Sequence, residues 1–386
     1  MKILLIIPSF YPAFVYGGPI FSTLYTLEEL TIDDEVHIKV CTTNANMNSK
    51  LNLPANRWLN VKGFPVKYYN ESVVGKFSLF LFFNIWKEIK EAKVIHIQSM
   101  FNTPTPISMM YSFIFKKPVL LSPRGALGKW CLSNGSKLKK LWLKILIKPF
   151  LKNTTWHATS EQEKNEILAI FPKAKVQIIP NGIKFSEYQM IKEKKVDLYT
   201  RLTKSIILEE DKVIVSMGRI QKKKGFDILI RSFIAVLTVY PSAKLLIAGD
   251  DEGELSYLNE LVEDKALMES VFFVGSVSNQ EKVDFLSHAD VFALPSHNEN
   301  FGNVYLESLA AGTPILASKN TPWADVETFG SGLWVENTVK STSDALLNLL
   351  LRNRDEMRIN SKVHAKKYGW DQVAIQFKKV YQAMAN

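Results

Sequence analysis

The sequence predicts a two-domain α/β protein in which buried parallel strands alternate with helices. Short, continuously apolar runs such as Ile3–Ile7 and Val213–Met217 stop at glycine, proline or polar residues, which is typical of strands covered on both faces. Longer stretches with helical spacing follow several of these runs, as at Ile20–Leu30 and Phe226–Val239. The chain has 386 residues, 47% of them hydrophobic, which is long for one domain and sufficient for the cores of two.

The formal net charge of +10 favours anionic partners. Polyanions, phosphorylated small molecules and anionic membranes all satisfy this charge. The sequence has neither the spacing of a zinc finger nor an aromatic RNA-binding signature, so we expect no nucleic acid partner. The two cysteines, Cys41 and Cys131, form no CxxC motif, which argues against a metal knuckle and a disulfide framework and favours a reducing cytoplasm.

The apolar start of the chain predicts a buried first strand, Ile3–Ile7, rather than a signal peptide. Pro8 and Pro12 cut the run short, and no small-residue cleavage site follows. No run approaches the roughly 20 apolar residues that a membrane-spanning helix needs. We therefore expect a cytoplasmic protein that is at most peripheral on the inner face of the cell membrane.

Two adjacent glycines, Gly17 and Gly18, separate the first strand from the helix predicted at Ile20–Leu30. Such a pair lets the backbone approach a ligand closely, although an ordinary turn explains it equally well. The pattern is not GxGxxG, so a dinucleotide-binding fingerprint is not supported. Further along, we predict a strand at Val36–Cys41, a polar connection over 44–60, and a buried or cleft-facing apolar helix over Val74–Trp86.

Two apolar runs, Val94–Gln98 and Lys117–Ser122, predict strands, and the second leads into Pro123-Arg124-Gly125. The guanidinium of Arg124 is suited to a phosphate or an acidic acceptor, because it binds such groups through paired hydrogen bonds. His96 is a second candidate here, but a single histidine in an apolar strand more often belongs to the core.

A basic helix is predicted over Ser136–Asn153, where six lysines are interspersed with large apolar side chains. One interpretation is an ordinary domain helix with a solvated lysine face. The other is a surface, Lys137–Lys152, that rests on anionic lipid and presents a lipid-linked acceptor. A strand ending near Ser160, which suits a helix cap, and another ending at Pro180–Gly182 complete the first domain, and the charged residues 184–210 are interpreted as a linker.

The second half begins with a cationic loop between the strand Val213–Met217 and the helix Phe226–Val239. In this loop Arg219 and Lys224 provide two fixed cations that suit a diphosphate, whereas a solvated loop is the simpler interpretation of the lysines alone. No Walker A pattern is present. We also predict strands at 243–248, 271–275 and 314–317, a loop without metal at Asp250–Glu252, and an amphipathic helix at Trp370–Met384.

The stretch from Pro295 to Glu307 predicts a strand end, a polar loop and the start of a helix. The strand Val291–Leu294 stops at Pro295, and the helix starts at about Gly302. Free N–H groups and the helix dipole at such a start suit an anion, above all phosphate. Glu299 and Glu307 are 307 − 299 = 8 residues apart, roughly 12 Å along one helix. This spacing suits two acids that touch different parts of an extended ligand, whereas a solvated loop acid and a surface helix acid are the simpler interpretation of the spacing alone.

The series Glu-x-Phe-Gly-x-x-x-x-Glu, after Pro-Ser and before Ala-Ala-Gly-Thr-Pro, resembles the signature of retaining glycosyltransferase family 4. Gly-Arg-x-x-x-x-Lys-Gly at 218–225 is similar to the second signature of that family. The resemblance covers nearly the whole chain and implies the GT-B fold, in which two Rossmann-like parallel-sheet domains face a central cleft. It places an acceptor-side domain at 1–182, a linker at 183–204, a nucleotide-sugar-binding domain at 205–365 and, at 366–386, a helix that crosses back to the first domain.

The resemblance also implies roles for individual residues. Glu299 would lie against the transferred sugar, and Glu307 would bind the ribose hydroxyls. Arg219 and Lys224 would hold the donor phosphates. Backbone contacts to the donor diphosphate are implied for Gly17 and Gly18, from the opposite domain, and for Asn300, Phe301, Gly302, Asn303 and Val304.

Arg124 occupies the place where many members of this family carry a histidine near the reacting sugar, so a catalytic role for it departs from the family pattern. Its Ser-Pro-Arg-Gly setting is similar to a subgroup that builds surface polysaccharides. The implied reaction, with Glu299 and Arg124 as catalytic residues, moves a sugar from a nucleotide-diphosphate donor to a hydroxyl of a lipid-linked or saccharide acceptor. It would retain the anomeric configuration and need no metal or other cofactor. A nucleotide-sugar epimerase of the same fold and a non-catalytic nucleotide-sugar-binding protein are the alternatives.

Overall fold

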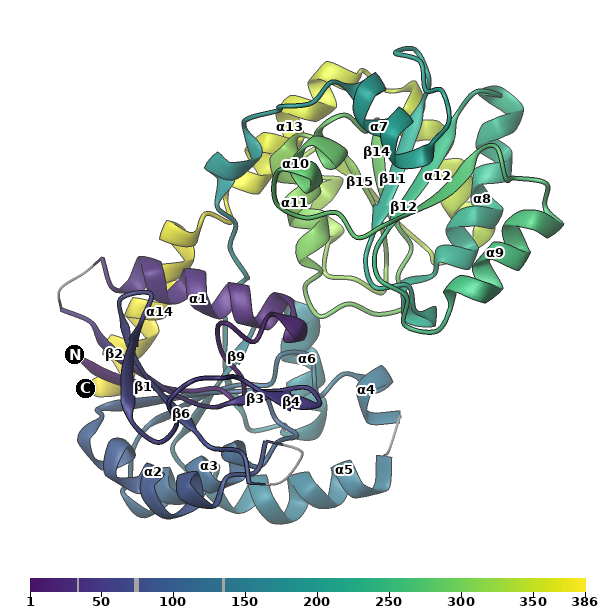
Figure 1. Ribbon diagram of the computed structural model, residues 1–386. Helices are drawn as coiled ribbons and strands as arrows, with labels where there is room; N and C mark the ends of the chain where they lie inside the picture. Colours follow the sequence, from purple (N-terminus) through teal and green to yellow (C-terminus); the bar gives the residue numbers. More distant parts are fainter. Residues whose placement is uncertain (33–34, 73–75, 134–135) are drawn as a thin grey trace. The chain divides into compact units, whose positions relative to one another are not determined.

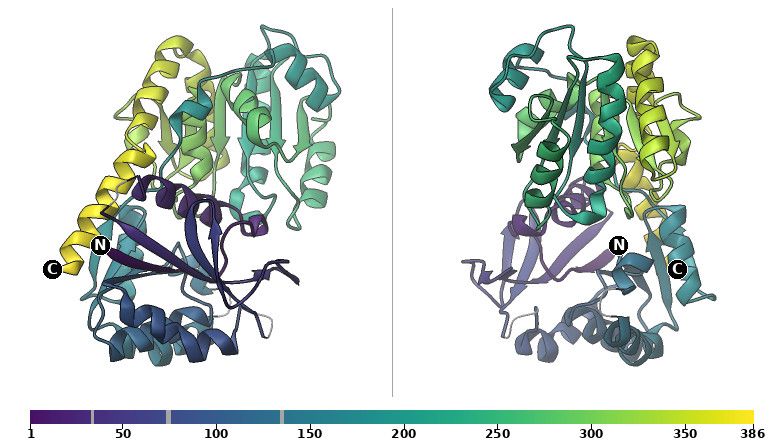
Figure 2. Two further views of the ribbon diagram at one scale, coloured as in Figure 1. Left: turned by 60° about the vertical axis from the view of Figure 1, so that its left-hand side comes forward. Right: turned by 90° about the vertical axis from the view of Figure 1, so that its right-hand side faces the viewer.

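A computed structural model describes residues 1–32, 35–72, 76–133 and 136–386. The chain forms two compact units (Figure 1). Unit 1 comprises Met1–Gly182 together with Trp370–Asn386, and unit 2 comprises Ile183–Gly369. Each unit contains its own sheet, with helices on both faces of it (Figure 2).

Unit 1 is built on an eight-stranded sheet in the order β10-β9-β8-β7-β1-β2-β6-β5. All neighbouring pairs are parallel except β5 and β6, which are antiparallel. The central strand β1 pairs on both sides, with Leu5 opposite Val40 on β2 and opposite His96 on β7. The strands are β1 (Lys2–Ile6), β2 (His37–Thr43), β5 (Trp58–Val61), β6 (Phe64–Tyr69), β7 (Val94–Gln98), β8 (Val119–Ser122), β9 (Thr154–Ala158) and β10 (Lys175–Ile178).

Alternate residues of β1 enter two different cores, because successive side chains of a strand point to opposite faces. Ile3 and Leu5 pack with helices α1 and α14, whereas Leu4 and Ile6 pack with α2 and α3. The helical segments of unit 1 are η1 (Phe14–Tyr16), α1 (Gly18–Leu30), α2 (Leu79–Glu91), α3 (Pro104–Ile114), α4 (Lys129–Ser133), α5 (Ser136–Trp142), η2 (Leu143–Ile147), η3 (Lys148–Phe150), α6 (Glu161–Ile170) and α14 (Trp370–Ala385).

Unit 2 is built on a six-stranded parallel sheet in the order β13-β12-β11-β14-β15-β16. Its strands are β11 (Val213–Met217), β12 (Lys244–Ala248), β13 (Val271–Gly275), β14 (Val291–Leu294), β15 (Ile315–Ser318) and β16 (Gly332–Val335). Its helical segments are η4 (Phe185–Tyr188), α7 (Lys195–Thr203), η5 (Lys222–Lys224), α8 (Phe226–Val239), α9 (Leu255–Asp264), α10 (Asn279–Ser287), α11 (Asn303–Ala311), η6 (Ala324–Val326), α12 (Val339–Leu351) and α13 (Arg354–Lys366).

Two predicted connections contain secondary structure. The polar connection over 44–60 includes the short antiparallel pair β3 (Ala45–Asn46) and β4 (Ser49–Lys50), and it ends within β5. The apolar helix predicted over 74–86 begins instead at Leu79, where Ser78 accepts a hydrogen bond from the Leu81 N–H; residues 73–75 lie outside the described part of the chain.

The linker predicted at 183–204 is part of unit 2. Leu198 and Tyr199 of α7 are buried in its core, and the Tyr199 hydroxyl donates to the Phe285 carbonyl at 2.7 Å. The linker prediction was wrong in this respect because Leu198 and Tyr199 stand among many lysines and glutamates, so no apolar pattern was visible in the sequence. At the other end of the chain, α14 contributes Trp370, Phe377 and Tyr381 to the core of unit 1.

Within the described residues, the helices are all too short or too polar to cross a membrane.

Candidate functional site

The loops that follow β11 and β14 meet at the carboxyl edge of the unit 2 sheet, because these two parallel strands are neighbours. The His297 N–H donates to the Lys223 carbonyl at 2.8 Å, which ties one loop to the other. Gly225 has a φ of +69°, and a Cβ there would lie 2.2 Å from the Pro295 carbonyl oxygen. Only glycine permits this approach, so the close packing of the two loops requires Gly225.

An ion pair between Lys224 and Glu299 lies where the two loops meet. The Lys224 Nζ is 2.6 Å from Glu299 Oε1, and the side chains are only 12% and 11% exposed. The Ser296 hydroxyl donates to the same carboxylate oxygen at 3.3 Å. Lys224 and Glu299, which were predicted as site residues from two separate motifs, are therefore in direct contact and largely buried.

Helix α11 begins directly beside this pair, at a glycine in the left-handed region. Gly302 has a φ of +77°, and a Cβ there would lie 2.6 Å from the Tyr305 ring. The Tyr305 hydroxyl donates to the Leu294 carbonyl at 2.6 Å, and burial raises its pKa well above the usual value. The N–H groups at the start of α11 are thus held in place with no acidic side chain in the first turn, as an anion site requires.

The Phe301 side chain anchors the loop rather than lining a site. It is buried 5.3 Å from the Trp323 ring, and the Trp323 indole donates to the Phe301 carbonyl at 2.7 Å. Its neighbours Asn300, Asn303 and Val304 lie in the loop and the first turn of α11. The backbone of this segment is therefore rigidly placed.

The two acids lie in different elements, as their spacing predicts. Glu299 is in the loop, whereas Glu307 is in the second turn of α11. Glu307 pairs with Lys282 of α10 at 2.9 Å and is 19% exposed. Each acid therefore forms an ion pair with a different lysine, Glu299 with Lys224 and Glu307 with Lys282.

Arg219 is the most exposed of the predicted site residues in unit 2. Its guanidinium, 66% exposed, pairs with Glu252 at 2.7 Å. Asp251 accepts the N–H groups of Gly253, Glu254 and Leu255, and these hydrogen bonds lower its pKa. The acids at 250–252 therefore shape a loop, and within the described residues no cluster of histidine, cysteine and acidic side chains is arranged to hold a metal.

In unit 1, Gly17 precedes α1 at the carboxyl side of β1. Its φ is +65°, and a Cβ added there would meet open space. The conformation, rather than crowding, is what favours glycine at this position. Gly18 is the first residue of α1.

Arg124 lies at the carboxyl edge of the unit 1 sheet, directly after β8. Its Nη2 donates to Gln98 Oε1 at 3.0 Å and its Nη1 to Asn181 Oδ1 at 3.1 Å. Gln98 is the last residue of β7 and Asn181 follows β10, and Thr23 of α1 donates to the same Gln98 oxygen at 2.8 Å. Burial lowers the pKa of Arg124, and the nearby Glu163 acts in the opposite direction.

His96 belongs to a buried chain of hydrogen bonds, as its place in an apolar strand suggested. His157 Nε2 must donate to the Ile179 carbonyl (2.8 Å), so its Nδ1 accepts from the Ser122 hydroxyl (2.7 Å). Ser122 then accepts from His96 Nε2 (2.8 Å), and His96 Nδ1 accepts from the Tyr381 hydroxyl (2.7 Å). Burial first, then the nearby Arg124, lowers the pKa of His157 to about 3. Both rings are therefore neutral.

Sequence reasoning missed the residues that hold Arg124. Asn181 belongs to the turn signal Pro180-Asn181-Gly182, whereas Gln98 and Glu163 are polar residues without a motif. Gln98 and Asn181 do share one signal, which is that each comes at or just after the end of a parallel strand.

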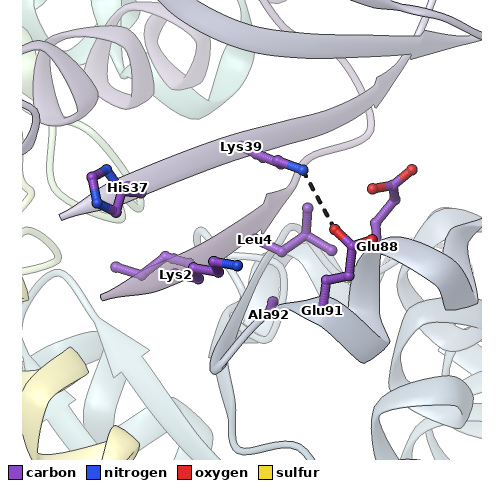
Figure 3. Close-up of a pocket in the computed structure, with 8 residues that line it drawn as sticks. Lys2, Leu4, His37, Lys39, Glu88, Glu91 and Ala92 are labelled. Carbon is purple, nitrogen blue, oxygen red and sulfur yellow. Dashed lines mark ion pairs between the residues drawn. The ribbon is translucent and has the colours of Figure 1, made fainter.

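A separate pocket lies at the opposite, amino end of β1 and β2 (Figure 3). It has a volume of about 140 Å³ and is lined by Lys2, Leu4, His37, Glu88 and Ala92, with a Lys39–Glu91 ion pair of 3.5 Å at its edge. Ligands of open α/β sheets gather at the carboxyl ends of strands, so this pocket is not our candidate.

Comparisons with known proteins agree with this geometry. Residues 201–368 match the family model described as Glycosyl transferases group 1. Alpha-monoglucosyldiacylglycerol synthase of Streptococcus pneumoniae is 29% identical over 193 residues, 49% of this chain and 43% of that protein. D-inositol 3-phosphate glycosyltransferase of Corynebacterium jeikeium is 35% identical over 186 residues, 45% and 44% of the two chains. The chain thus spans about half the length of the curated relatives that it matches.

Two solved structures match nearly the whole chain. Anabaena HepE in complex with UDP has a TM-score of 0.73 and 18% identity, covering 99% of this chain and 100% of its own. Sucrose-phosphate synthase of Thermosynechococcus elongatus has a TM-score of 0.73 and 18% identity, covering 100% and 99%. The two Rossmann-like units therefore have the GT-B fold. The match to the group 1 glycosyl transferase model lies within unit 2.

Proposed function

We propose that the protein is a retaining glycosyltransferase that transfers a sugar from a nucleotide-diphosphate donor to a hydroxyl group. The observation that carries this proposal is the Lys224–Glu299 pair at the start of α11, with Arg219 on the same loop as Lys224. The two cations and the start of α11 suit a diphosphate, and the neighbouring acid suits the sugar attached to it. The complex of HepE with UDP, a protein of the same fold, supports the choice of donor.

In the proposed reaction, the diphosphate of the bound donor replaces Glu299 as the ion-pair partner of Lys224. Lys224, Arg219 and the N–H groups of α11 then stabilise the charge that grows on the leaving diphosphate. Glu299, released from its lysine, orients the sugar and supports the positive charge at the anomeric carbon. The bond from that carbon to the diphosphate breaks, the bond to the acceptor oxygen forms on the same face, and the leaving phosphate takes the acceptor's proton. Fixed cations fill the role of a metal, so we propose that none is needed.

The remaining site predictions complete this proposal. Glu307, on the second turn of α11, stays a proposed contact of the ribose hydroxyls and would have to leave its ion pair with Lys282 to make it. Gly17 and Gly18 stay proposed contacts of the donor phosphate. Arg124 stays a proposed contact on the acceptor side.

We further propose a lipid-linked acceptor, as in the assembly of surface polysaccharides, reached from the membrane surface. Residues 92–160 contain eleven lysines and arginines and no aspartate or glutamate. Within this stretch, α3 contacts η2, and the Phe113 and Phe150 rings are 5.8 Å apart. Large apolar side chains stand exposed there, including Leu138 at 79% and Ile145 at 54%. A surface with this composition suits anionic lipid.

The donor site is tested by melting the protein in EDTA with UDP-, GDP- and ADP-sugars. We expect one nucleotide class to raise the melting temperature and Arg219→Ala to reduce that rise. No rise with any nucleotide, even after magnesium is added back, would refute the donor site. A donor that is converted without any acceptor would identify an epimerase, and one that binds but is never consumed, whatever the acceptor, would identify a binding protein.

The membrane surface is tested with vesicles of anionic and neutral lipid. We expect binding to anionic vesicles that weakens with salt, and a loss of about fivefold for each of Lys137→Gln, Lys140→Gln and Lys144→Gln, since a surface lysine contributes about 1 kcal/mol. The matched control changes the exposed lysines Lys192, Lys194 and Lys265 of unit 2 to glutamine. Equal binding to neutral vesicles, or an equal loss in the control, would exclude this surface.

A further inference from the structure

We propose that unit 1 holds a binding site for an anionic group, a phosphate or a carboxylate, with Arg124 as its cation. This rests on the proposed function and deepens it, because the anion would belong to the acceptor. The acceptor would then be a phosphorylated or acidic molecule rather than a neutral saccharide. The site is formed by unit 1 alone.

The first observation is that Arg124 is a half-buried cation whose hydrogen-bond partners are neutral. Its two terminal nitrogens donate to the amide oxygens of Gln98 and Asn181, and its buried Nε has no hydrogen-bond partner. Among the described residues, none of the carboxylates lies within ion-pair distance of it. A charge that is partly removed from water in this way is stabilised when an opposite charge joins it.

The second observation explains why a nearby acid does not fill this role. Glu163 is buried and close enough to act on Arg124 electrostatically. Its two oxygens, however, accept from the Gly125 N–H at 2.6 Å and from the Thr159 N–H and hydroxyl at 2.7 and 2.9 Å. Glu163 therefore fixes the loop that carries Arg124 and leaves the guanidinium without a direct counter-ion.

The third observation is the backbone of that loop. Arg124 and Gly125 have φ values of +57° and +75°, so two successive residues are in the left-handed region. For a residue with a Cβ this conformation is strained, and such residues concentrate at functional sites. A glycine at 124 would relieve the cost, yet the chain has an arginine there.

The fourth observation is the surroundings. The histidines behind Arg124 are held neutral by their hydrogen bonds, so they neither compete for an anion nor supply one. Thr23 brings α1 against Gln98, and α1 starts at the carboxyl edge of the same sheet. Strand ends, a helix start and one uncompensated arginine together form an anion site.

The test uses the full chain labelled with nitrogen-15 in its arginines. There are eight arginines, so the Nε–H signals can be assigned one by one from arginine-to-lysine variants. We would titrate sodium phosphate, sodium glucuronate and sodium chloride at constant ionic strength. The Arg124 Nε–H lacks a partner, and we expect its signal to move in a saturable way with phosphate or with glucuronate but not with chloride.

The outcomes separate the possible sources of the anion. A response to phosphate alone indicates a phosphorylated acceptor, whereas a response to glucuronate alone indicates an acidic sugar, and a response to both indicates a general anion site. A signal that moves with none of the three, or equally with chloride, would overturn the proposal. UDP addition, followed on Arg219, tests the donor site separately, so a failure of the proposed function is distinguishable from a failure of this site.

Discussion

The two units carry comparable cations in different electrostatic settings. Lys224 of unit 2 and Arg124 of unit 1 both lie at the carboxyl edge of a parallel sheet, and both are partly removed from water. Lys224 touches a carboxylate at 2.6 Å, whereas Arg124 touches only amide oxygens. The fold is the same, so the difference arises from single side chains in the loops.

The charge of Lys224 is therefore neutralised by a carboxylate of the same unit, whereas the charge of Arg124 has no such partner within ion-pair distance in the described part of the chain. In the reaction proposed for unit 2, the donor diphosphate would replace Glu299 as the partner of Lys224, so that binding would also release the acid. In unit 1 an anion would add to Arg124 without displacing a charge. The predictions below test this contrast, from the largest expected effect to the smallest.

Glu299→Gln should have the largest effect, a loss of turnover of about 10²- to 10³-fold, as when a group that stabilises the transition state is removed. The amide still accepts from Lys224, so nucleotide binding should persist. Initial rates with the donor found by melting, and calorimetry with its nucleotide, would check both parts. Turnover near that of the wild type would rule out a catalytic role for Glu299.

Lys224→Met and Arg124→Met should differ in stability. Breaking a buried ion pair leaves Glu299 uncompensated and should cost about 3 kcal/mol. Arg124→Met removes a costly cation instead, so we expect little change in the free energy of unfolding. Urea unfolding of the two variants side by side measures the difference. Equal losses would show that Arg124 is compensated in a way that its hydrogen bonds do not reveal.

Arg219→Ala should weaken nucleotide-diphosphate binding by about 2 kcal/mol, roughly thirtyfold, the usual value of a charge-assisted contact. Its exposed pair with Glu252 contributes little to the fold, so stability should hardly change. Calorimetry gives the affinity, and Glu252→Gln is the matched control, because it removes the pair and keeps the cation. Unchanged affinity in Arg219→Ala would exclude the contact.

The free energy of unfolding should depend on pH because His157 of unit 1 is neutral in the folded chain. The pKa of His157 is about 3 in the folded chain, against 6.5 for an ordinary histidine. Between these values only the unfolded chain binds the proton, so stability is full above pH 6.5 and falls as the pH drops towards 3, by at most about 1.4 kcal/mol per pH unit for this group.

His157→Gln is the variant for this test, because glutamine can still donate to the Ile179 carbonyl and accept from Ser122 without titrating. Urea midpoints between pH 4 and 6.5 should fall less steeply in the variant. An unchanged slope would show that His157 is protonated in the folded chain.

Much of the fold and half of the site follow from the sequence. The strands Val213–Met217 and Val291–Leu294 and the helix Phe226–Val239 occur at their predicted bounds. These are long buried runs with clear stops, where local pattern and burial agree. The neighbourhood of Lys224 and Glu299 was inferred from family signatures, and strand order then brings the two together.

The rest depended on contacts between residues distant in the chain. Helix α7 lies in charged sequence and is held by Leu198 and Tyr199 against elements far along the chain. Gln98, Asn181 and Glu163 acquire their roles only when three strand ends and α6 come together around Arg124. Apart from the turn signal at Pro180–Gly182, no short-range pattern marks such residues.

Helix α14 has a consequence for the order of events during synthesis. The ribosome makes most of unit 1 first, yet Trp370, Phe377 and Tyr381 fill its core, and Tyr381 supplies the hydrogen bond that His96 accepts. All of unit 2 is made in between. Until α14 has been synthesised, the core of unit 1 therefore lacks these three side chains and His96 lacks its hydrogen bond from Tyr381. Unit 2 is thus the first unit whose own residues are all available for folding.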